Sequence, residues 1–323
     1  MVKKYKVFIT RPIPEVGIKM LQKHFKVQLR KKDSPITKSE LEKGIKNCDA
    51  ILTILTDKVD GKLLDLNPNL KIVSNYAVGY NNIDIEACTK RGVLVGNTPD
   101  VLTTSTAESV FPLLLGVSKR LIEGDDIMRS GKFPGWGPMY LLGTELKGKI
   151  LGIAGAGRIG SETALMANKG FGMNIIYYNL NKNSQLEKKT GAKRVSFDKL
   201  LKDSDVISIH VPYMPETHHM FGTKEFKKMK NTAFIINTAR GPIINEKALV
   251  SALKKGDIGG AGLDVFENEP KLEPGLAKLK NVVMTPHTGS ATWEARNAMA
   301  EVAAQNIIGA LLPGKKPISI VNL

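Results

Sequence analysis

Residues 150–160 have the sequence Ile150-Leu-Gly-Ile-Ala-Gly-Ala-Gly-Arg-Ile-Gly160, an apolar run that passes into a glycine-rich turn. Gly155, Gly157 and Gly160 have the spacing G-x-G-x-x-G, which predicts a buried strand, a tight turn and then a helix. The first glycine permits the turn, the second lets a pyrophosphate approach the backbone, and the third lets the helix pack on the strand. The free N–H groups at the start of the helix would face the phosphates.

A second apolar segment, Met173-Asn-Ile-Ile-Tyr-Tyr178, follows after one helix length. The two segments and the helix between them form a strand–helix–strand unit, the context in which this glycine pattern binds dinucleotides. A glycine-rich turn that serves only packing is the alternative, and the complete unit disfavours it. The residues expected to bind the cofactor in this turn are Gly155, Ala156, Gly157, Arg158, Ile159 and Gly160.

The end of the second strand carries the residues that distinguish NAD from NADP. An NAD enzyme usually places Asp or Glu there to bind the ribose 2′-hydroxyl. This chain has Asn179, Leu180, Asn181 and Lys182 instead, so no carboxylate repels a 2′-phosphate and the lysine and amides can bind one. NADP is therefore the preferred prediction. NAD stays the alternative, because the same residues also suit a polar turn with a solvated lysine.

Composition limits the class of protein. With 323 residues, 42% hydrophobic and 24% charged, the chain can bury a large core and is expected to form about two domains. No apolar run reaches membrane-spanning length, and the N-terminal apolar segment is too short for a signal peptide. Cys48 and Cys88 lack metal-ligand spacing, so we expect free thiols, a cytoplasmic location and no metal.

The formal net charge of +16 raises the question of a nucleic-acid partner. The lysines are scattered along the whole chain, and no basic segment is interleaved with aromatic residues, which make up only 6% of the sequence. A solvated lysine surface that attracts small anionic substrates is the better interpretation, and neither nucleic acid nor membrane is expected as a partner.

Short apolar runs alternate with helical patterns along the chain, which predicts parallel strand–helix–strand units. Strands are expected at 5–10, 27–29, 50–55, 72–75, 93–96, 149–154, 173–178, 206–210, 233–237, 260–264 and 282–285. Helices are expected at 14–24, 37–45, 60–66, 83–90, 103–129, 246–255 and 292–312. The predicted fold is α/β, with two Rossmann-like doubly wound parallel-sheet domains and a cleft between them. Residues 1–99 plus 288–323 would form a flavodoxin-like substrate domain, and 100–287 the dinucleotide-binding domain.

Four further motifs occur together with the glycine pattern. They are Ala77-Val-Gly-Tyr-Asn-Asn-Ile-Asp84, Asn237-Thr-Ala-Arg-Gly-Pro-Ile-Ile-Asn-Glu-Lys-Ala-Leu249, Gly262-Leu-Asp-Val-Phe-Glu-Asn-Glu-Pro270 and Thr285-Pro-His-Thr-Gly289. In these motifs and their order, nearly the whole chain resembles the D-isomer-specific 2-hydroxyacid dehydrogenase family, and most of all its glyoxylate/hydroxypyruvate reductase branch. Their joint occurrence is far more specific than any one of them.

The resemblance implies reduction of a small 2-keto acid to the D-2-hydroxy acid, with Arg240, Glu269 and His287 as the catalytic residues. Such a reaction needs a proton donor, and imidazole titrates close to neutral pH. A carboxylate bonded to the ring orients it, which is the role implied for Glu269. Arg240 would bind the keto oxygen and the carboxylate of the substrate with its planar guanidinium.

The resemblance also implies binding contacts. Leu55, Val78 and Gly79 would meet the substrate, because an anion can approach the backbone at a glycine. The further cofactor contacts would be Thr106, Val211, Pro212, Thr217, Thr238, Ala239 and Asp264, the last accepting from the nicotinamide carboxamide. A homodimer is implied, in which Tyr140 of the partner subunit reaches the substrate; a plain hydrophobic anchor is the alternative for this side chain.

Other functions stay open. A sugar-acid reductase acting on 2-ketogluconate would have the same catalytic residues. A cofactor-sensing transcriptional corepressor on the same fold also retains the Arg, Glu and His. A 3-phosphoglycerate dehydrogenase is less favoured, because no added regulatory domain is present, and a formate dehydrogenase is disfavoured by Glu269.

Overall fold

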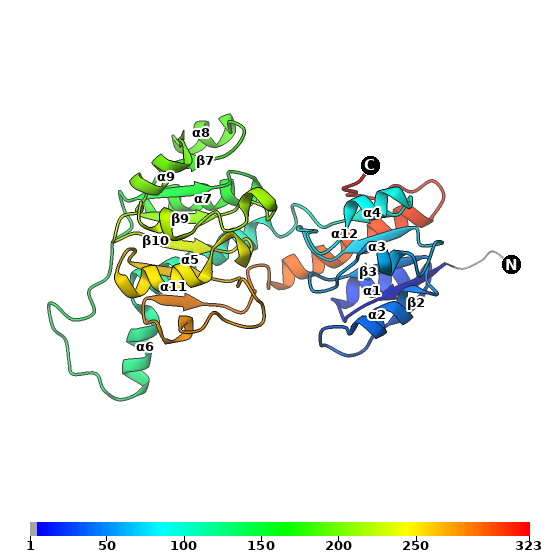
Figure 1. The fold of residues 1–323 in the computed structure, drawn as a ribbon, viewed down its shortest axis with the longest axis horizontal. Helices are drawn as coiled ribbons and strands as arrows, with labels where there is room; N and C mark the ends of the chain where they lie inside the picture. The colour runs from blue at the N-terminus through cyan, green and yellow to red at the C-terminus, as the bar shows by residue number, and fades with distance from the viewer. Residues whose placement is uncertain (1–4) are drawn as a thin grey trace. The chain divides into compact units, whose positions relative to one another are not determined.

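A computed structural model describes residues 5–323 of the chain (Figure 1). The chain divides into two compact units. Unit 1 ends at Leu102 and is completed by Ser290–Leu323, and unit 2 is Thr103–Gly289. Each unit has its own parallel sheet with helices on both faces, so the predicted pair of doubly wound α/β domains is confirmed.

Unit 1 has a five-stranded parallel sheet in the order β2-β1-β3-β4-β5. The strands are β1 (Lys6–Ile9), β2 (Lys26–Leu29), β3 (Ala50–Thr53), β4 (Ile72–Asn75) and β5 (Leu94–Gly96). The helices are α1 (Glu15–Gln22), α2 (Lys38–Ile45), α3 (Gly61–Leu64), α4 (Ile85–Lys90) and α12 (Trp293–Leu311). This is the flavodoxin-like strand order, and every residue of β3 and β4 is buried, as expected for central parallel strands.

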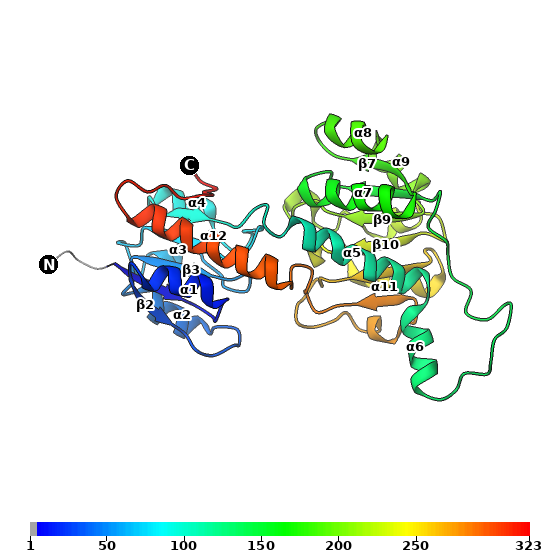
Figure 2. The same cartoon turned by 180° about the vertical axis from the view of Figure 1, so that it is seen from behind.

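The helices of unit 1 cover opposite faces of its sheet. Helices α2, α3 and α4 share one apolar cluster with the sheet, built around Phe8, Ile51 and Val73. Helices α1 and α12 pack on each other and α12 on strands β3 to β5, as seen from behind in Figure 2. The α1–α12 crossing is close, since a Cβ at Gly17 would lie 2.6 Å from the carbonyl oxygen of Ala300.

Unit 2 has a seven-stranded parallel sheet in the order β12-β11-β10-β9-β6-β7-β8. The strands are β6 (Ile150–Ala154), β7 (Asn174–Tyr178), β8 (Lys193–Arg194), β9 (Val206–Ile209), β10 (Phe234–Asn237), β11 (Gly260–Leu263) and β12 (Val282–Met284). The order reverses between β6 and β9, and α/β proteins bind their ligands at the carboxyl ends of strands at such a switch point.

The helices of unit 2 also lie on two faces. They are α5 (Thr103–Ser118), α6 (Leu121–Arg129), α7 (Arg158–Phe171), α8 (Ser184–Thr190), α9 (Phe197–Asp203), α10 (Thr223–Phe226) and α11 (Glu246–Lys255). Short 3-10 helices occur at Pro215–Thr217, Gly241–Ile243 and Leu276–Lys278. Helices α9 to α11 share one apolar cluster, and α5 and α7 share the other. Figures 1 and 2 show these two layers from opposite sides.

The prediction of one helix over 103–129 was wrong. Helix α5 ends at Ser118, because the Ser118 carbonyl accepts a hydrogen bond of 2.8 Å from the N–H of Thr144, and Arg120 then takes a left-handed conformation (φ 54°) before α6 begins. Strand β8 was not predicted, since its two residues are both exposed and carry no apolar pattern. Over the described residues 5–323, no helix is long and apolar enough to span a bilayer.

Candidate active site

The glycine turn after β6 has the geometry that its spacing predicted. Gly155 has φ +100°, and a Cβ there would lie 2.6 Å from the backbone nitrogen of Val211, at the end of β9. A Cβ at Gly160 would lie 2.1 Å from the Gly155 carbonyl oxygen, so helix and turn pack without a side chain between them. A Cβ at Gly157 would meet nothing within 4 Å, which leaves this part of the turn open to a ligand.

The start of helix α7 has the chemical character of an anion-binding site. Gly157 occupies its N-cap position and provides no side-chain hydrogen bond. The first N–H groups of a helix have no partner within the helix, and together with the dipole they favour phosphate. Thr238 lies after β10, and its buried hydroxyl also lacks a hydrogen-bond partner among residues 5–323. These groups fit a dinucleotide at the carboxyl edge of this sheet.

His287 and Glu269 form a hydrogen-bonded pair. Nδ1 of His287 lies 3.0 Å from Oε2 of Glu269, and the other carboxylate oxygen accepts from the N–H of Phe266 at 3.0 Å. The two side chains are 31% and 36% exposed, so the pair reaches solvent. Because Nδ1 faces the carboxylate, Nε2 of His287 is the nitrogen left to serve a ligand, and no residue in 5–323 is bonded to it.

The backbone fixes the imidazole. His287 has φ +54°, a left-handed conformation uncommon for a residue other than glycine. Its N–H donates to the carbonyl oxygens of Asp264 at 2.8 Å and Thr285 at 3.0 Å. The turn that follows β12 is thus fastened to the end of the neighbouring strand β11.

Arg240 and Glu269 interact electrostatically. Burial lowers the pKa of Arg240, and the negative charge of Glu269 opposes that shift. Burial by itself would raise the pKa of Glu269, but the hydrogen bond and charge of His287, the Phe266 N–H and Arg240 outweigh it, so this pKa lies below its ordinary value. The structure therefore gathers all three predicted catalytic residues around one ionised carboxylate.

Asp264 is buried, and its carboxylate is bonded within the protein. It is 1% exposed and accepts from the Thr285 hydroxyl (2.6 Å) and from the N–H groups of Thr288 (2.7 Å) and Gly289 (2.8 Å). A buried carboxylate needs such donors, so Asp264 shapes the turn that carries His287. Its expected contact with the nicotinamide carboxamide stays a prediction.

The residues predicted for the ribose side lie beside the glycine turn. Oδ1 of Asn179 accepts from the N–H of Ala156 at 3.2 Å, and its Nδ2 donates to the carbonyl of Asn181 at 2.9 Å. Lys182 is paired with Glu187 at 3.2 Å. The side chain of Leu180 is 80% exposed. The Asn179 amide is thus at the turn, and the Lys182 ammonium group has an acidic partner in helix α8.

Sequence reasoning overlooked Arg194 in this region. Its Nε donates to the carbonyl of Asn179 at 3.0 Å, and its Nη2 donates to the carbonyl of Leu180. The guanidinium therefore supports the loop after β7 from the edge strand β8. The sequence shows only a basic residue some distance after the dinucleotide motif. It does not indicate that β8 pairs with β7, and this pairing brings Arg194 to the loop.

The other predicted contacts of unit 2 are placed as follows. Val211 and Pro212 follow β9, and the Thr217 hydroxyl donates to the Pro212 carbonyl at 2.7 Å. Thr106 lies in the first part of α5 and is buried, and Ala239 follows β10. His210, next to Val211, is bonded to Ser208, and burial lowers its pKa to about 3, so its ring is neutral.

The predicted substrate residues of unit 1 lie after two neighbouring strands. Leu55 follows β3, and Val78 and Gly79 follow β4. The carbonyl of Val78 accepts from Asn97 and that of Gly79 from Asn75, each at 2.9 Å. Neither asparagine was among the residues predicted from the sequence.

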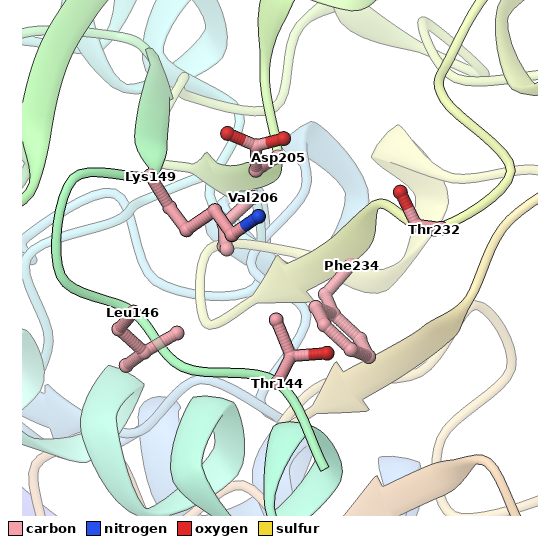
Figure 3. Close-up of a pocket in the computed structure, with 7 residues that line it drawn as sticks. All are labelled: Thr144, Leu146, Lys149, Asp205, Val206, Thr232 and Phe234. Atoms are coloured by element: carbon pink, nitrogen blue, oxygen red, sulfur yellow. The ribbon is translucent and has the colours of Figure 1, made fainter.

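A small pocket of about 150 Å³ lies at the opposite edge of the unit 2 sheet (Figure 3). It is lined by Thr144, Leu146, Lys149, Asp205, Val206, Thr232 and Phe234. Lys149, Asp205 and Thr232 precede or begin β6, β9 and β10, at the amino ends of these strands. This pocket is too small for a dinucleotide and is remote from the glycine turn.

Comparison with known proteins agrees with this geometry. Residues 111–289 match the family model "D-isomer specific 2-hydroxyacid dehydrogenase, NAD binding domain". The chain is 52% identical to glyoxylate reductase of Thermococcus litoralis over 323 residues, which is 99% of this chain and 97% of that one. The chain therefore belongs to the D-isomer specific 2-hydroxyacid dehydrogenase family, a family of oxidoreductases that bind a nicotinamide cofactor.

Solved structures give the same result. A glyoxylate reductase from Paecilomyes thermophila is 33% identical, with a TM-score of 0.89 and 99% of each chain covered. An NADPH-dependent glyoxylate/hydroxypyruvate reductase from Sinorhizobium meliloti, solved with NADP and malonate, is 28% identical with a TM-score of 0.86. It matches 99% of this chain and 97% of its own. The predicted family and fold are confirmed.

The lowered pKa of Glu269 has a consequence for stability. A carboxyl whose pKa is lower in the folded state stabilises the fold above its ordinary value, about 4.5, and this stabilisation is lost as the pH falls. We expect the free energy of unfolding of wild type to fall more than that of Glu269→Gln between about pH 6 and pH 3, where this carboxyl becomes protonated, as measured by urea denaturation. The difference should be under about 1 kcal/mol, because the pair is partly exposed.

Glu294→Gln is the control for this measurement, since Glu294 is exposed and lies in the other unit. Its acid-induced loss should equal that of wild type. Equal losses for wild type and Glu269→Gln would contradict the electrostatic assignment of the carboxylate.

Proposed function

We propose that this protein reduces a small 2-keto acid, glyoxylate or hydroxypyruvate, to the D-2-hydroxy acid with NADPH or NADH. The observation that carries this proposal is the His287–Glu269 pair at the carboxyl edge of the dinucleotide-binding sheet, with Arg240 beside it. The 52% identity to a glyoxylate reductase over nearly the full length supports the substrate class.

The proposed mechanism uses the three side chains in separate roles. Arg240 binds the keto oxygen and the carboxylate, and so draws electrons away from the carbonyl carbon. Nε2 of His287 gives its proton to that oxygen as the alcohol forms. Glu269 keeps the ring oriented through its contact with Nδ1. When bound, the reduced nicotinamide supplies the hydride for the carbonyl carbon.

Residues after β6, β7, β9 and β10 would hold that cofactor. The uncapped start of α7 and Gly157 suit its phosphates, and the buried, unpartnered hydroxyl of Thr238 suits a polar group of the nicotinamide half. Val78 and Gly79 would bind the substrate carboxylate through their N–H groups. In this proposal unit 2 provides the cofactor contacts and the three catalytic side chains, and unit 1 provides further contacts to the substrate carboxylate.

The first test is an absorbance assay of reduced-cofactor oxidation with glyoxylate, hydroxypyruvate, pyruvate and 2-ketogluconate. Glyoxylate or hydroxypyruvate should give the highest kcat/KM. His287→Ala should lower kcat about 10²- to 10⁴-fold, because it removes the proton donor. The dissociation constant of NADPH, measured by its fluorescence, should stay within about twofold of wild type, since the phosphate-binding turn is untouched.

His24→Ala is the matched control, since His24 is an exposed imidazole in unit 1. Its kcat should equal that of wild type. Wild-type turnover by His287→Ala would exclude the proton-donor role, and a clear preference for 2-ketogluconate would replace the proposed substrate.

We propose NADP rather than NAD as the preferred cofactor. Asn179 offers an amide where a carboxylate would repel a 2′-phosphate, and the cations of Lys182 and Arg194 lie around the same loop. Lys182 must share its charge with Glu187, so the preference is expected to be moderate.

Asn179→Asp tests this preference. An aspartate keeps the oxygen that accepts from the Ala156 N–H, so the turn should persist, while its charge repels a 2′-phosphate. The KM for NADPH should rise about tenfold or more and that for NADH should change little, as measured by steady-state kinetics. Asn69→Asp, the same change at an exposed asparagine of unit 1, is the control and should leave both KM values unchanged. A wild type that prefers NADH would refute the proposal.

We also propose that the chain forms a homodimer through α6 and the arm that follows it. Helix α6 has no buried residue, and Leu121, Met128, Trp136 and Met139 are between 59% and 86% exposed. Such a concentration of exposed apolar side chains is typical of an interface.

A reducing, cytoplasmic location is proposed from the two free, buried thiols, Cys48 and Cys88.

Sedimentation equilibrium should give twice the 35.3 kDa mass of one chain. Replacing both Trp136 and Met139 by Ser should shift this mass towards the monomer, because burial of their apolar surface stabilises the dimer. The paired change Lys31→Ser and Lys32→Ser, at exposed polar positions, is the control. A monomeric wild type would contradict the proposal.

Tyr140→Ala with an unchanged substrate preference would exclude contact between substrate and Tyr140 of the partner subunit.

A further inference from the structure

The loop after β4 has both its carbonyl groups held from inside unit 1. Nδ2 of Asn97 donates to the carbonyl of Val78, and Nδ2 of Asn75 donates to the carbonyl of Gly79, each at 2.9 Å. The N–H groups of Val78 and Gly79 have no partner among residues 5–323. Two carbonyls turned inward leave these N–H groups as the donors that can meet an anion.

The Asn97 carboxamide is itself bonded on its other side. Its Oδ1 accepts from the hydroxyl of Ser319 at 2.6 Å, in the C-terminal segment. Asn97 is only 6% exposed, so an oxygen without a donor there would carry a desolvation cost. The Ser319 hydroxyl thus favours the orientation in which the NH₂ group of Asn97 faces Val78.

The C-terminal segment is fastened to the same part of unit 1. Asn306, which is fully buried in α12, accepts through Oδ1 from the N–H groups of Ile318 (3.0 Å) and Ser319 (2.8 Å). Its Nδ2 donates to the carbonyl of Asn97 at 2.9 Å. One buried amide therefore fixes the distance between the segment and Asn97.

The remainder of the segment continues the sheet. The N–H of Val321 donates to the carbonyl of Val95 at 2.9 Å, and the N–H of Val95 donates to Oδ1 of Asn322 at 2.8 Å. Ile320 pairs with Gly96 in an antiparallel bridge. The segment is thus held along the edge strand β5, and its bridge at Gly96 lies one residue before Asn97.

We propose that Ser319–Asn322 is a positioning element for substrate binding, which acts through Ser319, then Asn97, then the carbonyl of Val78. None of these side chains needs to touch the substrate. Their effect is to hold the Val78 and Gly79 N–H groups outward, where a small carboxylate accepts from them. This inference rests on the proposed reduction of a 2-keto acid.

Ser319→Ala tests the proposal, because it removes the hydroxyl and keeps the backbone bonds to Asn306. We expect the KM for glyoxylate to rise about 3- to 10-fold, the effect of one lost hydrogen bond. The inhibition constant of oxalate, a carboxylate probe, should rise in parallel. The kcat and the KM for NADPH should stay within about twofold of wild type, because the proton donor and the cofactor site lie in unit 2.

Two variants separate positioning from a structural effect. Ser319→Thr keeps the hydroxyl and should restore the wild-type KM. Ile318→Ala, at an exposed side chain of the same segment, should leave the KM unchanged. A purely structural role would lower the melting temperature of Ser319→Ala and leave its KM at the wild-type value, which would overturn the inference. An equal rise in KM for Ser319→Thr would also overturn it.

Asn97→Asp provides an independent measurement. It replaces the donor that faces the Val78 carbonyl by an oxygen, so the KM should rise more than in Ser319→Ala. Turnover by the wild-type protein tests the proposed function separately. If wild type reduces no 2-keto acid, the proposed function is refuted. Turnover by wild type with an unchanged KM in Ser319→Ala and Asn97→Asp would refute only the positioning role.

Discussion

The buried carboxylate of Asp264 is the constraint on which the geometry of unit 2 depends. It lies at the end of β11, is 1% exposed, and takes hydrogen bonds from the Thr285 hydroxyl and from the N–H groups of Thr288 and Gly289. An ionised group can be buried only with such donors around it. In meeting this need, the chain after β12 folds back over β11, and His287 is held in a left-handed conformation that directs its ring to Glu269.

The carboxylate partner of His287 is fixed in a comparable way. A Cβ at Gly241 would lie 1.9 Å from the carbonyl carbon of Phe266, so the turn after Arg240 packs directly on the segment that leads to Glu269. In that segment Glu267 is paired with His219 at 2.6 Å, and its other oxygen accepts from the N–H of Glu246 at the start of α11. Arg240, Glu269 and His287 thus come together through close backbone packing at Gly241 and through carboxylates that bond neighbouring backbone N–H groups.

The two units have the same α/β architecture but present their backbone N–H groups in different ways. Unit 2 has a glycine at the N-cap position of a fourteen-residue helix, where the helix dipole favours phosphate. Unit 1 presents free N–H groups in a loop, and it does so by binding the loop carbonyls with the buried amides of Asn75 and Asn97. In the proposed function, these N–H groups of unit 1 would bind the substrate carboxylate, which needs fewer donors than a pyrophosphate.

The sequence by itself determined the periodic and local features: both parallel sheets, the glycine turn, and the strand ends that carry Arg240, Glu269 and His287. These follow from apolar runs, from glycine spacing and from motif order, all of which are properties of neighbouring residues. Only the tertiary structure decided the break between α5 and α6, the support of Asn179 by Arg194, the internal bonding of Asp264 and the connection from Ser319 to Val78. Each of these depends on hydrogen bonds between residues far apart in the chain. The local sequence pattern of one segment does not predict which distant residue it will bond.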